Sequence, residues 1–129
     1  MIKQEFAVKH YWKVIVYYNV GYNLFDIIAE DCRKAGVSES TIDELYDMMY
    51  NHKAKAATYS NTQRHISIVL FNRHKSSEDY LNSIVHEAEH IKQAMLKTYD
   101  VTDADEPPAY TLGYLIGRMW EVFKRFICR

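Results

Sequence analysis

The stretch HISIVLFN at residues 65–72, followed at residues 76–98 by SSEDYLNSIVHEAEHIKQAMLKT, decides the fold class of this chain. In the first part apolar residues alternate, with Ile66, Ile68 and Leu70 on one face, as in a β-strand. In the second part Ser76, with Asp79 three residues later, is typical of a helix N-cap, and we expect the helix to run to about Thr98. A strand that passes directly into a long helix indicates a mixed α and β protein.

The same criteria, applied outward from this stretch, predict the other elements. We expect Gly36 to end one helix and Ser40 to cap the helix that follows it. The predicted elements are a strand at 12–20 with Trp12, Val14, Val16 and Tyr18 on one face, helices at 24–34 and 40–51, a weaker strand at 54–60, a hairpin turn at 60–63 and a last helix at 108–127. The order β-α-α-β-β-α-α predicts one α+β domain over residues 1–129, with a small, mostly antiparallel three-stranded sheet.

Composition narrows the classes of partner. The formal net charge is −1 and the basic residues are scattered, so we expect no nucleic-acid partner. No apolar run is long enough to span a bilayer, so we expect no membrane partner. Cys32 and Cys128 show no metal or disulfide spacing and are interpreted as buried thiols, which suits a cytoplasmic protein. The sequence does not indicate an oligomeric state.

The run HEAEH at residues 86–90 matches the motif HExxH. Residues four apart lie on one helix face, so the imidazoles of His86 and His90 can converge on one Zn²⁺ ion. Glu87 lies about 100° around the helix and can reach a water on the metal. Both histidines project away from the apolar stripe of this helix, which argues against core histidines and leaves a solvated polar face as the simpler alternative. That stripe is Leu81, Ile84, Val85, Ala88, Ile91 and Met95.

The last helix offers a third ligand. Glu106, at its start, is the candidate, Asp103 and Asp105 are rivals in the preceding acidic loop, and a residue that only complements the helix dipole is the alternative. Gly113 and Gly117 share a helical face with Glu106. Because glycine is unfavourable inside a helix, these two residues predict a close helix–helix contact there.

Together these segments resemble the zincin metallopeptidases, specifically the gluzincin type, which carry HExxH on one helix and a glutamate on a later one. The segment from Glu106 to Tyr110 is similar to an E-x-x-A-Y element of small zincin-like proteins from bacterial and phage genomes, and the resemblance covers roughly residues 65–118. Two departures from the gluzincin pattern are the short chain and Tyr110, which stands where an aspartate usually follows the third ligand.

The resemblance implies a zinc-dependent peptidase that hydrolyses a peptide or protein substrate. His86, His90 and Glu106 would be the zinc ligands, and Glu87 would be the general base that acts on the metal-bound water. Tyr110 or Tyr114 would stabilise the oxyanion, and the strand at 65–72 would bind an extended peptide along its edge. Two alternatives stay open: a catalytically silent zincin-fold binding or regulatory protein of a phage or mobile element, and an ordinary interaction domain in which HExxH is accidental.

Overall fold

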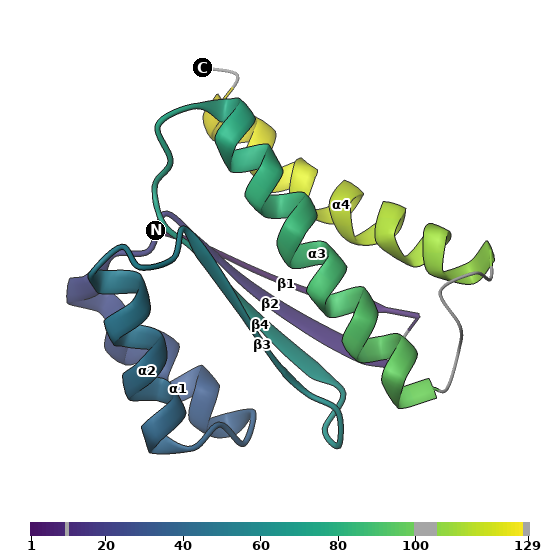
Figure 1. Ribbon diagram of the computed structural model, residues 1–129, viewed down its shortest axis with the longest axis horizontal. Coiled ribbons are helices and arrows are strands. Elements are labelled where there is room, and N and C mark those ends of the chain that lie inside the picture. The colour runs from purple at the N-terminus through teal and green to yellow at the C-terminus, as the bar shows by residue number, and fades with distance from the viewer. Residues whose placement is uncertain (10, 100–105, 128–129) are drawn as a thin grey trace.

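The computed structural model describes residues 1–9, 11–99 and 106–127, with side chains described for all of these except 106–109 and 127. Within these ranges the chain is an α+β domain with four α-helices and a four-stranded mixed sheet (Figure 1). The elements are β1 (Ile2–Val8), β2 (Trp12–Tyr18), the short 3-10 helix η1 (Tyr22–Leu24), α1 (Phe25–Lys34), α2 (Glu39–Tyr50), β3 (Ala56–Asn61), β4 (Ile66–Phe71), α3 (Ser77–Tyr99) and α4 (Glu106–Ile127).

The strands lie in the order β1-β2-β4-β3, so β1 and β3 are the two edges of the sheet. The β1–β2 and β3–β4 pairs are antiparallel, whereas β2 and β4 are parallel, with Ile15 opposite Ile68. The predicted three-stranded, mostly antiparallel sheet is therefore wrong in two details: β1 was not predicted, and the central pairing is parallel.

Helices cover both faces of the sheet, which gives three layers (Figure 1). On one face α3 and α4 pack over Trp12, Val14, Val16 and Tyr18, the four residues predicted to share a face of β2. Trp12 is fully buried, and its indole Nε1 donates a hydrogen bond to Ser67 Oγ at 2.9 Å. The predicted alternation in β2 is therefore confirmed, because these four side chains are buried in the same core.

The other face of the sheet carries α1 and α2. They pack against Ile15, Tyr17, Ile68 and Leu70, so the predicted division of β4 into two faces is confirmed. Cys32 of α1 is buried in this layer, and burial raises the pKa of its thiol to about 11. Leu24, the predicted first residue of this helix, instead ends η1 and is 42% exposed.

Helix ends follow local capping chemistry. Gly36 has φ +85° just after α1, which confirms it as a helix stop. The cap of α2 is Ser38 rather than the predicted Ser40: Ser38 Oγ accepts a hydrogen bond from the Thr41 amide at 3.2 Å. Ser76 Oγ accepts from the Asp79 amide at 3.1 Å, so the predicted cap before α3 is confirmed.

Helix α4 packs against α3 and lies close to β1. The close contact predicted at Gly113 and Gly117 is wrong, because a Cβ atom added to either glycine would meet nothing within 4 Å. Both glycines are exposed. None of the helices, over the residues that the structure describes, combines the length and apolar character required to cross a membrane.

Candidate metal centre

The HExxH segment lies in the middle of α3, which crosses the sheet beside its β3 edge (Figure 1). Ile84, Ala88, Ile91 and Met95 are buried against the sheet and α4, as predicted. His86 and His90 are exposed and lie off this stripe, which confirms that they are not core histidines. The stripe is narrower than predicted, because Leu81 and Val85 are 38% and 41% exposed.

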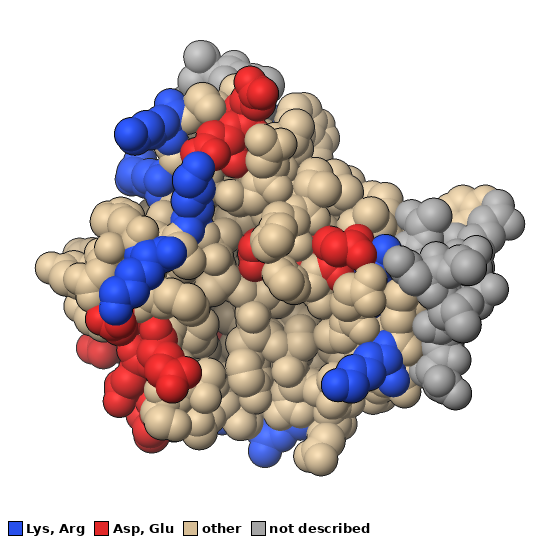
Figure 2. Space-filling view, viewed as in Figure 1, with Lys and Arg blue, Asp and Glu red and all other residues tan. Residues whose placement is uncertain are grey.

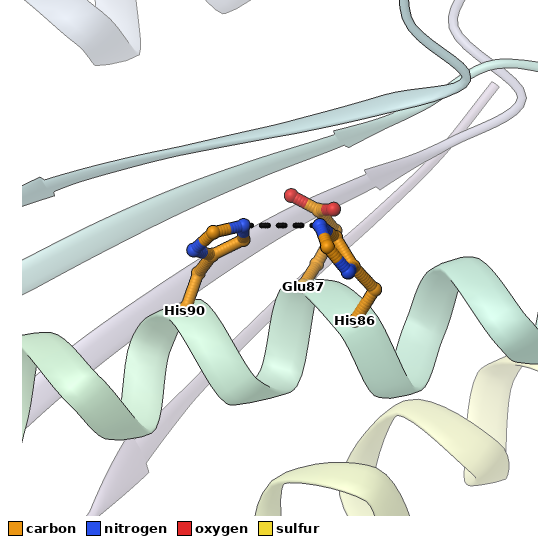
Figure 3. A group of neighbouring side chains, drawn as sticks. All are labelled: His86, Glu87 and His90. Carbon is orange, nitrogen blue, oxygen red and sulfur yellow. Dashed lines mark hydrogen bonds between the residues drawn. The ribbon is translucent and has the colours of Figure 1, made fainter.

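The two histidine rings converge. His86 Nε2 and His90 Nε2 lie 3.1 Å apart, and both side chains point toward the strands (Figure 3). Two imidazole ligands about 2.0–2.1 Å from a tetrahedral zinc would have nitrogens about 3.3 Å apart. The observed spacing is close to this value, and it also suits a direct hydrogen bond between the two rings.

Glu87 completes the group. One ligand atom of each of His86, Glu87 and His90 can be chosen so that all three lie within 4.8 Å of one another. Among the residues that the structure describes, this is the one cluster of three or more His, Cys, Asp or Glu with such convergence. Imidazole nitrogens are common zinc ligands, and the carboxylate lies close enough to contact a water bound to the same ion.

The Glu87 side chain lies between α3 and β3. It is only 4% exposed, and its Oε1 accepts a hydrogen bond from Thr58 Oγ1 of β3 at 2.9 Å. This contact fixes the carboxylate at the side of the two imidazoles, on the strand side of the helix. The sequence did not predict a role for Thr58. The alternation of side chains in β3 indicates which face of the sheet Thr58 lies on, but it does not indicate that Glu87 of α3 lies opposite.

A pocket of about 360 Å³ opens at the histidines, along β3. Its walls are Met48, Ala56, Ala57, Thr58, Ser60, His86, Glu87, His90 and Ala94. A second hollow of about 380 Å³ continues past Lys55 and Asp79, whose side chains form an ion pair at 2.6 Å. The two hollows share Ala56, His86 and Glu87, so they form one groove that follows the β3 edge.

The surroundings of the groove carry little charge. In Figure 2 the middle of the molecule, where α3 crosses in front of the sheet, is mostly uncharged, with a few acidic groups among neutral surface. Lys and Arg side chains gather nearer the margins of this face. The groove itself is lined by the Glu87 carboxylate and by the Lys55–Asp79 ion pair, so it carries charges of both signs.

The structure does not bring Tyr110 to the histidines. Tyr110 lines a separate pocket at the end of β1 with Val8, Lys9 and Tyr114, and the Tyr114 hydroxyl donates to the carbonyl of Ala7 at 3.1 Å. In Figure 3 α4 passes on the side of α3 away from the histidines. The side chain of Glu106 and all of Asp103 and Asp105 lie outside the described residues, so the third ligand stays a prediction.

The strand at 65–72, which was expected to bind a peptide along its edge, has no free edge. The 65–72 segment forms β4, which is paired on both sides, by β2 and by β3. The prediction of edge pairing at this strand is therefore wrong. The edge beside the histidines belongs to β3, which among the described strands pairs only with β4.

Comparison with protein-family models, with curated proteins and with solved structures finds no match to this chain. The geometry of the site is therefore the basis on which a function can be assigned.

Proposed function

We propose that this chain is a zinc-dependent metallopeptidase with a minimal zincin-like domain. The observation that carries the proposal is the 3.1 Å approach of His86 Nε2 to His90 Nε2 beside a nearly buried Glu87 carboxylate. A direct hydrogen bond between the two rings would also give this spacing, so the convergence of the Glu87 carboxylate on the same place is what favours a metal site. The gluzincin-like order of motifs in the sequence supports the same assignment.

Each of the three residues has a distinct role in the proposal. His86 and His90 hold the ion, which would supply Lewis-acid chemistry and lower the pKa of the water that it binds. Glu87 takes the proton of the attacking water and passes it to the leaving amine. Thr58 is a positioning residue, since its hydroxyl donates to Glu87 Oε1 at 2.9 Å and holds the carboxylate close to the two imidazoles.

The third ligand is proposed to be Glu106, with Asp103 and Asp105 as alternatives. A tetrahedral catalytic zinc takes three protein ligands and keeps one open position. Replacement of each acid by alanine, one at a time, should identify the ligand as the substitution that weakens zinc binding most.

A peptide is the proposed substrate class because the groove follows an unpaired strand edge. An extended peptide can add to such an edge through main-chain hydrogen bonds, and the pockets on either side then select side chains. The walls formed by Ala56, Ala57 and Ser60 are small, which leaves room for a peptide backbone beside the histidines.

Metal content tests the first half of the proposal. Protein purified without chelator should carry one zinc per chain by elemental analysis, and His86→Ala or His90→Ala should remove it. His52→Asn is the matched control, because His52 is exposed and has φ +54°, a conformation that asparagine tolerates. Metal content far below one per chain, unchanged by either alanine substitution, would refute the site.

Hydrolysis tests the second half. The zinc-loaded chain should cleave fluorescein-labelled casein, and Glu87→Gln should keep the zinc while it abolishes cleavage. If the wild-type chain binds one zinc but releases no peptide from this substrate or from other unfolded proteins, the silent zincin-fold binding protein is the better assignment. Intact cleavage by Glu87→Gln would refute the role of Glu87.

A further inference from the structure

The groove beside the histidines differs in charge between its two ends. Apart from the histidines, Glu87 is the only charged residue among the described residues that line the hollow along β3. The second hollow extends from His86 to Lys55 and Asp79, whose side chains form an ion pair at 2.6 Å. A peptide in the groove therefore meets an additional pair of charges at one end only.

The charged end lies about three residues of extended peptide away from the histidines. Asp79 precedes His86 by seven residues in α3, which corresponds to about 10 Å along the helix axis. An extended chain advances about 3.4 Å per residue, so about three residues cover this length. The count along the strand agrees, because Lys55 lies three residues before Thr58, the residue that donates to Glu87.

Cationic side chains outnumber acidic ones around this end of the groove. The charged residues of the loop before α3, of the first turn of α3 and of the adjoining strand are Arg73, Lys75 and Lys55 against Glu78 and Asp79. In Figure 2 Lys and Arg side chains gather with acidic ones at the upper left, where Figure 1 places this loop and the start of α3. The positive end of the α3 dipole adds to the same potential.

Lys55 is the more accessible member of the ion pair. Its side chain is 66% exposed, against 30% for that of Asp79. The pKa of the Asp79 carboxyl is lowered, first by its hydrogen bond to Lys55 and further by the charges of His74 and Lys75, so Asp79 stays ionised among cations. An ammonium group has three donors, and an exposed ion pair is weak, so Lys55 can donate to a second carboxylate at little cost.

We propose that Lys55 selects peptides that carry a carboxylate about three residues from the scissile bond. Antiparallel pairing is the more stable arrangement of two strands, and a peptide antiparallel to β3 has its C-terminal part at Lys55. The carboxylate therefore lies on the C-terminal side of the bond, in an Asp or Glu side chain or at the free C-terminus. The inference rests on the proposed function, because it requires a peptide that lies along β3.

The bonds cleaved in a random peptide library test this preference. Peptides with amidated C-termini are incubated with the zinc-loaded wild type, and mass spectrometry identifies the cleaved bonds. Asp and Glu should be enriched about fivefold near the third residue on the C-terminal side, which is the upper range for an exposed ion pair. The same library with free C-termini should be cleaved mainly near the third residue from the end if the terminal carboxylate is the ligand. Either result supports the inference and identifies the carboxylate.

Two substitutions that break the same ion pair separate recognition from a structural role. Lys55→Gln should remove the preference, whereas Asp79→Asn should increase it, because Lys55 then has no competing carboxylate. If the pair only stabilises the fold, both substitutions should change cleavage in the same direction, and the inference is overturned. Lys53→Gln is the matched control and should keep the wild-type preference, since Lys53 pairs with Asp47 at 2.7 Å and lines neither hollow.

A binding measurement separates this inference from the peptidase proposal. Two fluorescein-labelled peptide pools, identical except that Glu in one is Gln in the other, are titrated with the zinc-loaded Glu87→Gln chain. Fluorescence anisotropy should show about fivefold tighter binding of the Glu pool, and Lys55→Gln in the same background should remove the difference. If the wild type cleaves nothing but the pools still differ in this way, the peptidase proposal fails and the inference stands. Equal affinities, cleavage without acidic enrichment, or acidic enrichment on the N-terminal side would overturn the inference.

Discussion

Replacement of Thr58 by valine should destabilise the metal-free protein by about 2 kcal/mol. Valine keeps the shape of threonine but removes the hydroxyl that donates to Glu87 Oε1 at 2.9 Å. Since Glu87 is only 4% exposed, water cannot readily replace the lost donor. A hydrogen bond to a carboxylate contributes about 1.5–3 kcal/mol, and an unsatisfied buried acceptor retains its desolvation cost.

The assay is reversible unfolding in urea with EDTA present, followed by a thermal melt. At about 2.1 cal/mol/K of unfolding entropy per residue, the 129-residue chain should lose about 7 °C in Tm. Thr58→Ser is the matched control, because it keeps the hydroxyl and loses only a methyl group. A Thr58→Val protein within about 0.5 kcal/mol of the wild type would refute the reasoning, and so would a Thr58→Ser protein that is equally destabilised.

Three further predictions concern the metal, a turn and a thiol. Zinc at a free concentration of 100 times its Kd should stabilise the wild type by about 2.7 kcal/mol, and a thermal melt of His86→Ala with zinc should show no such shift. Gly36→Ala should cost about 1–2 kcal/mol in urea unfolding, because φ is +85° and the new Cβ would lie 3.0 Å from Asn61 Nδ2; wild-type stability would contradict this. With Cys128→Ser in place, Cys32 should resist a thiol reagent at pH 8 and react faster as pH rises toward its pKa of about 11; rapid labelling of the native protein at pH 8 would contradict this.

Local patterns in the sequence predicted most helices and the faces of the strands, because side-chain period reports which side of an element is buried. The alternation at Trp12, Val14, Val16 and Tyr18 is an example, since all four meet the same core. The spacing of apolar side chains along a strand does not indicate which other strands lie beside it. The parallel β2–β4 pairing joins Ile15 to Ile68, and nothing local in either strand specifies it.

The strand Ile2–Val8 was missed for a local reason. It buries only every second residue, and one of these, Gln4, is polar. Gln4 is satisfied there by tertiary partners: its side-chain amide donates to the Arg118 carbonyl at 2.7 Å, and its Oε1 accepts from the Tyr18 hydroxyl at 2.6 Å. Burial of Gln4 is favourable only because β2 and α4 supply these hydrogen-bond partners. The sequence of residues 2–8 does not indicate that such partners exist.

At the candidate site, spacing alone predicted that His86 and His90 share a helix face, and the 3.1 Å contact agrees. The burial of Glu87 and its hydrogen bond to Thr58 depend on how α3 packs against β3. Local sequence patterns do not predict this packing. The glycines of α4 show the limit of a sequence argument of the same kind. Their cost in a helix predicted a close helix–helix contact, but both glycines are exposed and a Cβ atom on either would meet nothing within 4 Å.

The place of β4 in the middle of the sheet has a consequence for how the chain folds. The β1–β2 hairpin is local and can form early, but its partner β4 is synthesised only after α1, α2 and β3. Parallel pairing between distant strands carries a large loop-closure cost and is slow. Until β4 arrives, the inner edge of β2 is unpaired and offers a template for other chains. We therefore expect refolding to be limited by closure of this central pair, and aggregation during refolding to compete with that step.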